Sequence, residues 1–257
     1  MHFGAAVYYD RDFRQSPETA VAVVELLSKL GSGTISVRGM LSDSDKWVRA
    51  TSLSEKSKRT LIAEIRDGMF SDLVAEGRSA NSTTASISIQ LFDGNPHQEG
   101  RLTYSNQSQS DYRLVEEVSV ALWKALEARY GFSIFGRSEK AVLQELSATP
   151  IVHWQERVPA DTEQRLLRIQ RHKRSFGTDA RGAAWGTFLG PELVERLGGE
   201  ECVKQEAPVQ LVEKVADGLY LRLLDHPLLI ESPEYEGPAA RLERYLSAVM
   251  PHDLVKR

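Results

Sequence analysis

Two segments that alternate between apolar and polar residues, and that each turn back on themselves, most constrain the fold of this chain. In the first, the inward positions are Ala85, Ile87, Ile89 and Leu91, and serines and Gln90 lie between them. This is the period of a strand with one buried face. The turn sequence Asp93-Gly94-Asn95-Pro96 follows, and residues 101–105 return as a partner strand. The pattern therefore predicts an antiparallel hairpin.

The second alternating segment lies near the C-terminal end of the sequence. Val209, Leu211 and Glu213 run into Val215, and Leu219, Leu221 and Leu223 run back with polar residues between them. Asp217-Gly218 separates the two runs and is a strong hairpin signal. Further strands are predicted at residues 3–9, 33–40 and 47–50.

Helical spacing predicts the remaining elements. Ser16 is predicted to cap a helix that has Pro17 in its first position and Glu18 in its first turn and that ends at Gly31. Other helices are predicted at 53–70, 111–130, 139–146 and 238–249, a helix or strand at 162–171, and loops at 75–82 and 225–237. Because the strands form hairpins and do not alternate regularly with helices, the fold class is α+β, with mainly antiparallel sheet or sheets and packed helices. We predict an N-terminal lobe, 1–135, and a C-terminal lobe, 136–257, with one continuous domain as the alternative.

The stretch WGTFLGPELVERLGG, residues 185–199, predicts one short helix, because it has sequence signals for both helix ends. Pro191 suits the first helical position. Glu192 in the first turn and Arg196 in the last turn carry the charges that the helix dipole favours there. Gly198 or Gly199 can end the helix in a left-handed conformation. We expect no acid, base or nucleophilic chemistry from this stretch.

This stretch, with the hairpin at Gln210–Leu223 and the last helix near Ala239–Val249, resembles bacterial immunity proteins of type VI secretion and polymorphic-toxin systems. The group that it resembles is paired with toxins of restriction-endonuclease-like fold, and the likeness covers the last third of the chain. The resemblance implies a cytoplasmic protein that is not an enzyme and that neutralises a cognate toxin by tight binding. It brings no catalytic residues and no shared contact motif.

The composition restricts the classes of function. The chain of 257 residues has a formal net charge of −4, whereas a general nucleic-acid binder usually has a basic excess. Its single cysteine allows no intrachain disulfide. The sequence begins without the pattern of a signal peptide and has no run long enough to span a membrane. We therefore predict a cytoplasmic protein without a membrane or direct nucleic-acid partner.

No linear motif indicates a catalytic, metal or cofactor site. The six histidines are scattered, and no spacing of zinc ligands, serine-hydrolase motif or phosphate-binding loop occurs. We therefore predict no enzymatic activity, no cofactor and no metal. A second interpretation is an enzyme or nucleotide-binding domain whose site assembles from scattered residues around His153, Glu156 and His172. A third, a nucleic-acid adaptor, depends on the basic run Arg168–Arg174.

Two acidic segments are the candidate toxin-binding surface. The candidate residues are Asp43, Asp45, Glu231, Glu234, Tyr235 and Glu236. A nuclease holds the phosphate backbone in a positively charged groove, and carboxylates presented to that groove accelerate association and favour the cognate pair. Tyrosine is enriched at binding hot spots. The predicted partner is therefore a nuclease toxin; the sequence leaves the oligomeric state open.

Overall fold

The structure is a computed structural model that describes residues 1–31, 33–44, 46–78, 84–92, 97–105, 112–148 and 160–255. The chain forms two compact units. Unit 1 consists of Met1 and Ala5–Ala128, and unit 2 consists of His2–Gly4 and Arg129–Arg257. The domain prediction made from the sequence stays a prediction, and the two units are described separately.

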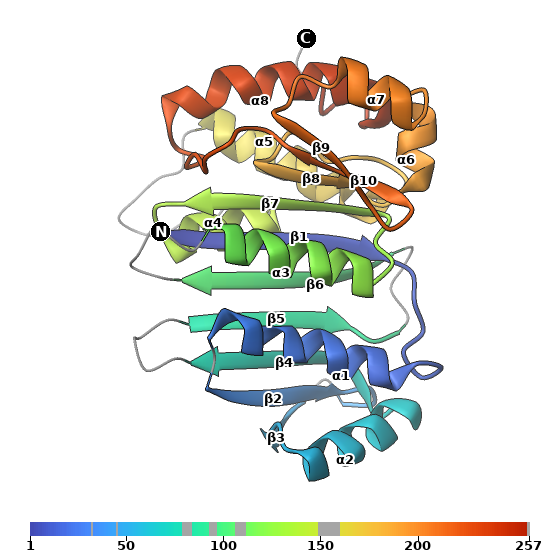
Figure 1. Ribbon diagram of the computed structural model, residues 1–257. Helices are drawn as coiled ribbons and strands as arrows, with labels where there is room; N and C mark the ends of the chain where they lie inside the picture. The colour runs from blue at the N-terminus through green and yellow to red at the C-terminus, as the bar shows by residue number, and fades with distance from the viewer. Residues whose placement is uncertain are drawn as a thin grey trace. The chain divides into compact units, whose positions relative to one another are not determined.

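Unit 1 is built on a sheet with the strand order β3-β2-β4-β5-β6-β1 (Figure 1). Its strands are β1 (His2–Tyr9), β2 (Thr34–Leu41), β3 (Trp47–Ser52), β4 (Phe70–Arg78), β5 (Thr84–Gln90) and β6 (Gln98–Ser105). The pairs from β3 through β6 are antiparallel. The predicted hairpin is confirmed, since Ile87 of β5 lies opposite Leu102 of β6.

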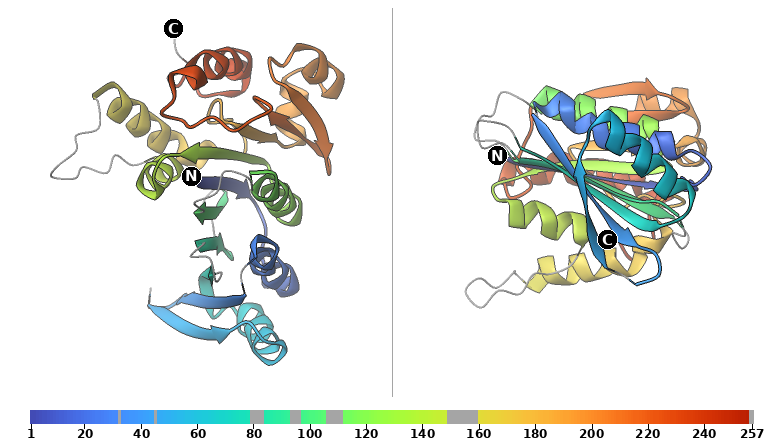
Figure 2. Two further views of the ribbon diagram at one scale, coloured as in Figure 1. Left: turned by 60° about the vertical axis from the view of Figure 1, so that its left-hand side comes forward. Right: turned by 90° about the horizontal axis from the view of Figure 1, so that it is seen from below.

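Three helices lie along one face of this sheet, as the left view of Figure 2 shows. They are α1 (Pro17–Glu25), which continues as the 3-10 helix η1 (Leu26–Leu30), α2 (Glu55–Arg66) and α3 (Tyr112–Ala125). The apolar positions of β5 are buried against them, whereas its polar alternates are half-buried on the other face. On that face, the hydroxyls of Ser86 and Thr103 lie 2.7 Å apart. The alternation of apolar and polar residues in the sequence therefore correctly predicts which residues of β5 face the core.

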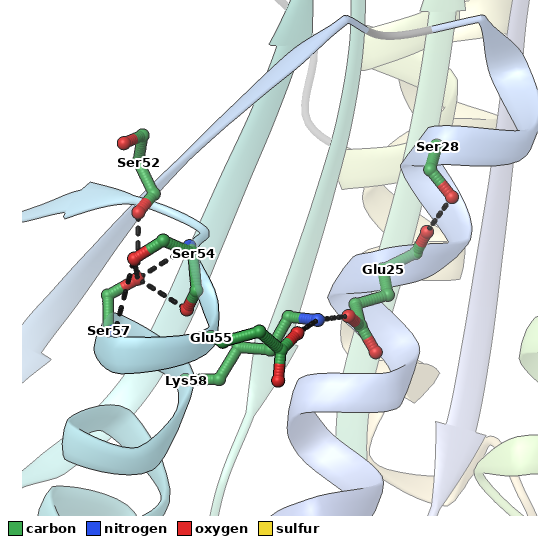
Figure 3. Close-up of polar contacts among 7 residues, drawn as sticks. All are labelled: Glu25, Ser28, Ser52, Ser54, Glu55, Ser57 and Lys58. Atoms are coloured by element: carbon green, nitrogen blue, oxygen red, sulfur yellow. Dashed lines mark hydrogen bonds and ion pairs between the residues drawn. The ribbon is translucent and has the colours of Figure 1, made fainter.

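Polar contacts fix the start of α2 and its position beside α1 (Figure 3). The Ser54 side chain accepts a hydrogen bond from the backbone N–H of Ser57, and the Ser57 hydroxyl accepts one from the backbone N–H of Ser54, so the two form a capping box. Lys58 bridges Glu55 of its own helix, with 2.6 Å between Nζ and Oε1, and Glu25 of α1. Lys58, directly after the capping residue Ser57, thus links the two helices.

Substituting Ser54 with alanine is expected to lower the free energy of unfolding by about 1 kcal/mol, because the backbone N–H of Ser57 loses its acceptor at the start of the helix. Urea titration followed by circular dichroism measures this loss. Ser42→Ala is the matched control, since the Ser42 hydroxyl is also exposed and donates to a single carbonyl, that of Gly68, without accepting from a backbone N–H at a helix start. Equal stability of Ser54→Ala and wild type would contradict the role of the cap.

Unit 2 combines four strands in the order β7-β8-β10-β9 with five α-helices among its described residues. Its strands are β7 (Tyr130–Gly136), β8 (Gly186–Leu189), β9 (Leu211–Val215) and β10 (Gly218–Arg222). Its helices are α4 (Glu139–Ser147), α5 (Ala160–His172), α6 (Pro191–Arg196), α7 (Glu200–Glu206) and α8 (Pro233–Leu246), with 3-10 turns η3 (Lys173–Ser175) and η4 (Ser247–Val249). The paired strands are antiparallel, so the α+β prediction is confirmed.

The core of unit 2 gathers around Trp185, whose side chain is fully buried. Its ring meets Phe135 edge-to-face, with 4.9 Å between ring centroids, and Phe135 in turn contacts Phe3 at 5.0 Å. The indole N–H donates to the carbonyl of His226 over 3.1 Å. Trp185 thus fills space and also satisfies its polar atom.

Five predictions about secondary structure are wrong. The predicted helix 53–70 ends at Arg66, and Phe70 begins β4. Residues 75–78 belong to β4 and not to a loop, because Ala75 and Gly77 continue its buried face. The predicted helix 111–130 ends at Ala125, and Tyr130 begins the fully buried strand β7. Residues 233–237 begin α8, and Pro238 lies inside that helix. Ser16 precedes α1 without a side-chain cap, since its hydroxyl accepts from Arg11 Nε at 3.1 Å.

Gly218 has a different role from the one its sequence suggests. The turn between β9 and β10 falls on Ala216 and Asp217, because Gly218 already pairs with Val215, and Ala216 has a φ of +52°. A Cβ atom at Gly218 would lie 2.4 Å from the carbonyl oxygen of Leu189. Glycine is therefore needed for the close approach of β10 to β8.

Candidate functional site

The candidate site is a groove in unit 2 with a volume of about 990 Å³. Residues of α4, α5 and α8 line it, together with residues 230–232 and parts of β7 and the C-terminal segment. Figure 1 labels the three helices. The lining includes six carboxylates and four cationic side chains, besides apolar residues such as Ile230 and Leu254. This volume lies at the upper end of the range typical of ligand sites.

A partly buried ion cluster lies in the lining of the groove, and we call it the base; the Glu145 side chain is 12% exposed and the Arg165 side chain 39% exposed. Glu145 of α4 accepts hydrogen bonds from Arg165 of α5, with 2.6 Å between Nη2 and Oε1, and from Arg181. The Arg181 side chain is only 7% exposed, and its guanidinium also lies over the Phe132 ring, 4.2 Å from the centroid. The cluster therefore connects α4, α5 and the segment before β8.

The charges in the cluster balance each other. Burial acts to raise the pKa of Glu145, but Arg181 and Arg165 outweigh it, so the pKa lies below its usual value and the carboxylate stays ionised. Burial acts to lower the pKa of Arg165, but the charges of Glu145 and Glu243 raise it. Two carboxylates thus face two guanidiniums, and the base of the groove is close to neutral.

Tyr235 of α8 adds a half-buried phenol to this base. Its hydroxyl lies 3.5 Å from the carbonyl oxygen of Ala183, to which it donates. Burial raises the pKa of Tyr235, and the charge of Glu145 raises it further, so the phenol stays protonated. Its place near the ion cluster differs from the exposed tyrosine anchor that the sequence suggested.

Three exposed carboxylates, Asp161, Glu231 and Glu236, also line the groove; we call them the rim carboxylates. Glu231 accepts a hydrogen bond from the backbone N–H of Arg137 at 3.2 Å. Among the described residues, no lysine or arginine side chain forms an ion pair with Asp161 or Glu236 within 4 Å. Negative charge is therefore less compensated at the rim than at the base.

The structure brings together three of the six residues predicted for toxin contact. Glu231, Tyr235 and Glu236 all line the groove. Glu234 does not line it; its carboxylate accepts from the Ser232 hydroxyl at 2.5 Å. Asp43 is exposed in the turn that follows β2 in unit 1, and Asp45 lies outside the described residues.

The residues of the alternative interpretations are placed only in part. His153 and Glu156 lie outside the described residues. His172 ends α5, with its Nε2 atom 2.5 Å from Oδ1 of Asp253. The basic run 168–174 follows the last turns of α5 into η3. The described part of the chain contains no cluster of three or more side chains suited to bind a metal ion.

No helix among the described residues combines the length and the apolar character that a membrane crossing requires.

The fold has a counterpart among solved structures. A T6SS protein of Pseudomonas aeruginosa matches 96% of this chain and 73% of its own chain, with a TM-score of 0.58 and 12% sequence identity. At this identity the match shows the shared fold. No protein-family model and no curated protein match the sequence.

Proposed function

We propose that this chain is an immunity protein, which binds and neutralises a cognate toxin delivered by type VI secretion. The observation that carries the proposal is the match of nearly the whole chain to a T6SS protein. The resemblance of residues 185–199 and 210–223 to T6SS immunity proteins supports it from the sequence. On this proposal the protein acts in the cytoplasm by binding and not by catalysis.

The partner that we propose is a nuclease. The net charge of −4 and the rim carboxylates are complementary to a protein that holds a phosphate backbone with cationic side chains. Inhibition by occupancy requires that nearly all toxin is bound, so we expect a dissociation constant on the order of 1 nM or below.

The test is co-expression of the full chain with the product of the neighbouring gene. We expect a one-to-one complex on purification, nanomolar affinity by calorimetry and recovery of a host whose growth the toxin arrests. The purified toxin should also cease to cut nucleic acid when this protein is in molar excess. Unchanged cleavage under that excess would falsify the proposal.

A further inference from the structure

We infer that the groove of unit 2 receives a lysine or arginine side chain of the partner. The inference rests on the proposed function and adds the site of contact and the chemistry of the contacting group. The cation would come from the surface with which the toxin holds the phosphate backbone, so that binding in the groove withdraws it from nucleic acid.

The distribution of charge selects a cationic occupant. The lining contains two more carboxylates than cations. Glu145 and Glu243 lie with Arg165 and Arg181 at the base, so the excess belongs to the exposed part of the groove. Asp253 is there paired with Arg171 and His172, which lie outside the lining, so the cation is expected at Asp161 and Glu236. There, Asp161 and Glu236 can each accept hydrogen bonds from an incoming ammonium or guanidinium group.

The apolar lining suits the rest of such a side chain. Half-buried Ile230 and Leu254 line the same groove as the rim carboxylates. Lysine and arginine bury an aliphatic stem against apolar surface and keep the charged group among polar partners. A groove with apolar walls and an acidic rim therefore matches both parts of the side chain.

The ion cluster prepares the groove for binding. Arg165 and Arg181 each donate a hydrogen bond to Glu145. A cation that binds at the rim carboxylates therefore does not have to break these hydrogen bonds. Because the cluster also joins α4 to α5, two walls of the groove are fixed before the partner arrives. Such preorganisation reduces the ordering cost of association.

The decisive experiment removes the charges of the rim carboxylates Asp161 and Glu236, which form no ion pair with another described residue, without changing side-chain size. The full-length double variant Asp161→Asn/Glu236→Gln is titrated against the purified toxin by calorimetry. We expect its dissociation constant to be about tenfold higher than that of wild type at low salt, and the difference to shrink as salt screens the charges. Glu195→Gln/Glu213→Gln, which removes two exposed charges elsewhere in unit 2, should stay within about twofold of wild type.

The outcomes separate the inference from the proposed function. Wild-type protein that neither binds nor neutralises the toxin removes the proposed function. Wild-type protein that does both, with an Asp161→Asn/Glu236→Gln variant of equal affinity, overturns the groove inference alone. Hydrogen–deuterium exchange of the wild-type complex gives an independent measurement: amides of α5 and of the first turns of α8 should become protected, and protection confined to unit 1 would also overturn the inference.

Discussion

Replacement of Glu145 with alanine is expected to lower the free energy of unfolding by about 3 to 5 kcal/mol. The substitution leaves Arg181, which is 7% exposed, facing Arg165 without the carboxylate between them. Removing one partner of a buried ion pair leaves the remaining charge uncompensated, and this cost exceeds the net contribution of the pair. Urea titration measures the loss, and exchange of the α4 and α5 amides assigns it to unit 2.

Glu139→Gln on the same helix is the matched control, because Glu139 is exposed in the first turn of α4. It should stay within about 0.5 kcal/mol of wild type. Comparable losses in both variants would mean that any change in α4 destabilises the protein, and the ion cluster would then have no special role.

The same cluster predicts a dependence of stability on acid. The pKa of Glu145 is lower in the folded protein than its ordinary value of 4.5. Its contribution is therefore fully present above pH 4.5 and is lost as the pH falls through the lower pKa of the folded state. In Glu145→Gln this part of the acid dependence should be missing, so the two stability curves should approach each other below pH 4.5.

Trp185→Ala is expected to lower the free energy of unfolding by about 3 to 5 kcal/mol. The substitution opens a cavity beside Phe135 and leaves the carbonyl of His226 without the indole donor. The matched control is Trp47→Ala in unit 1, since that indole is 48% exposed and its removal leaves no enclosed cavity. Its expected loss is about 1 kcal/mol or less, and equal losses at the two positions would contradict the role assigned to Trp185.

A comparison of two helix starts shows how far the sequence determines the fold. Two helices start with the same three residue types, Ser16-Pro17-Glu18 and Ser232-Pro233-Glu234. In each, the serine precedes the helix and the proline is its first residue. The sequence predicts a helix start only at the first, because Gly237 and Pro238 favour a loop after the second. In the structure the apolar face at Ala239, Leu242 and Leu246 is buried, and this packing outweighs the local preference.

The site was harder to predict than the strands, because its central residues are far apart in the sequence. Glu145 lies 20 residues before Arg165 and 36 before Arg181. A signal was nevertheless present. Glu145 lies on the face of α4 that buries Val142 and Leu146, and Arg165 lies on the face of α5 that buries Leu166 and Ile169. Charged residues on two buried helix faces indicate an internal ion pair.

The composition of unit 2 determines how the protein can be divided for experiments. Its compact unit includes His2–Gly4, which are separated from the rest of it by more than a hundred residues of sequence. Phe3 contacts Phe135, and a Cβ atom at Gly4 would lie 2.4 Å from Val142 of α4, the helix that also carries Glu145. A fragment that begins at Arg129 would therefore expose part of this core. A truncation that removes residues 2–4 is expected to disturb the packing of α4, and with it the groove, although none of these residues lines the groove.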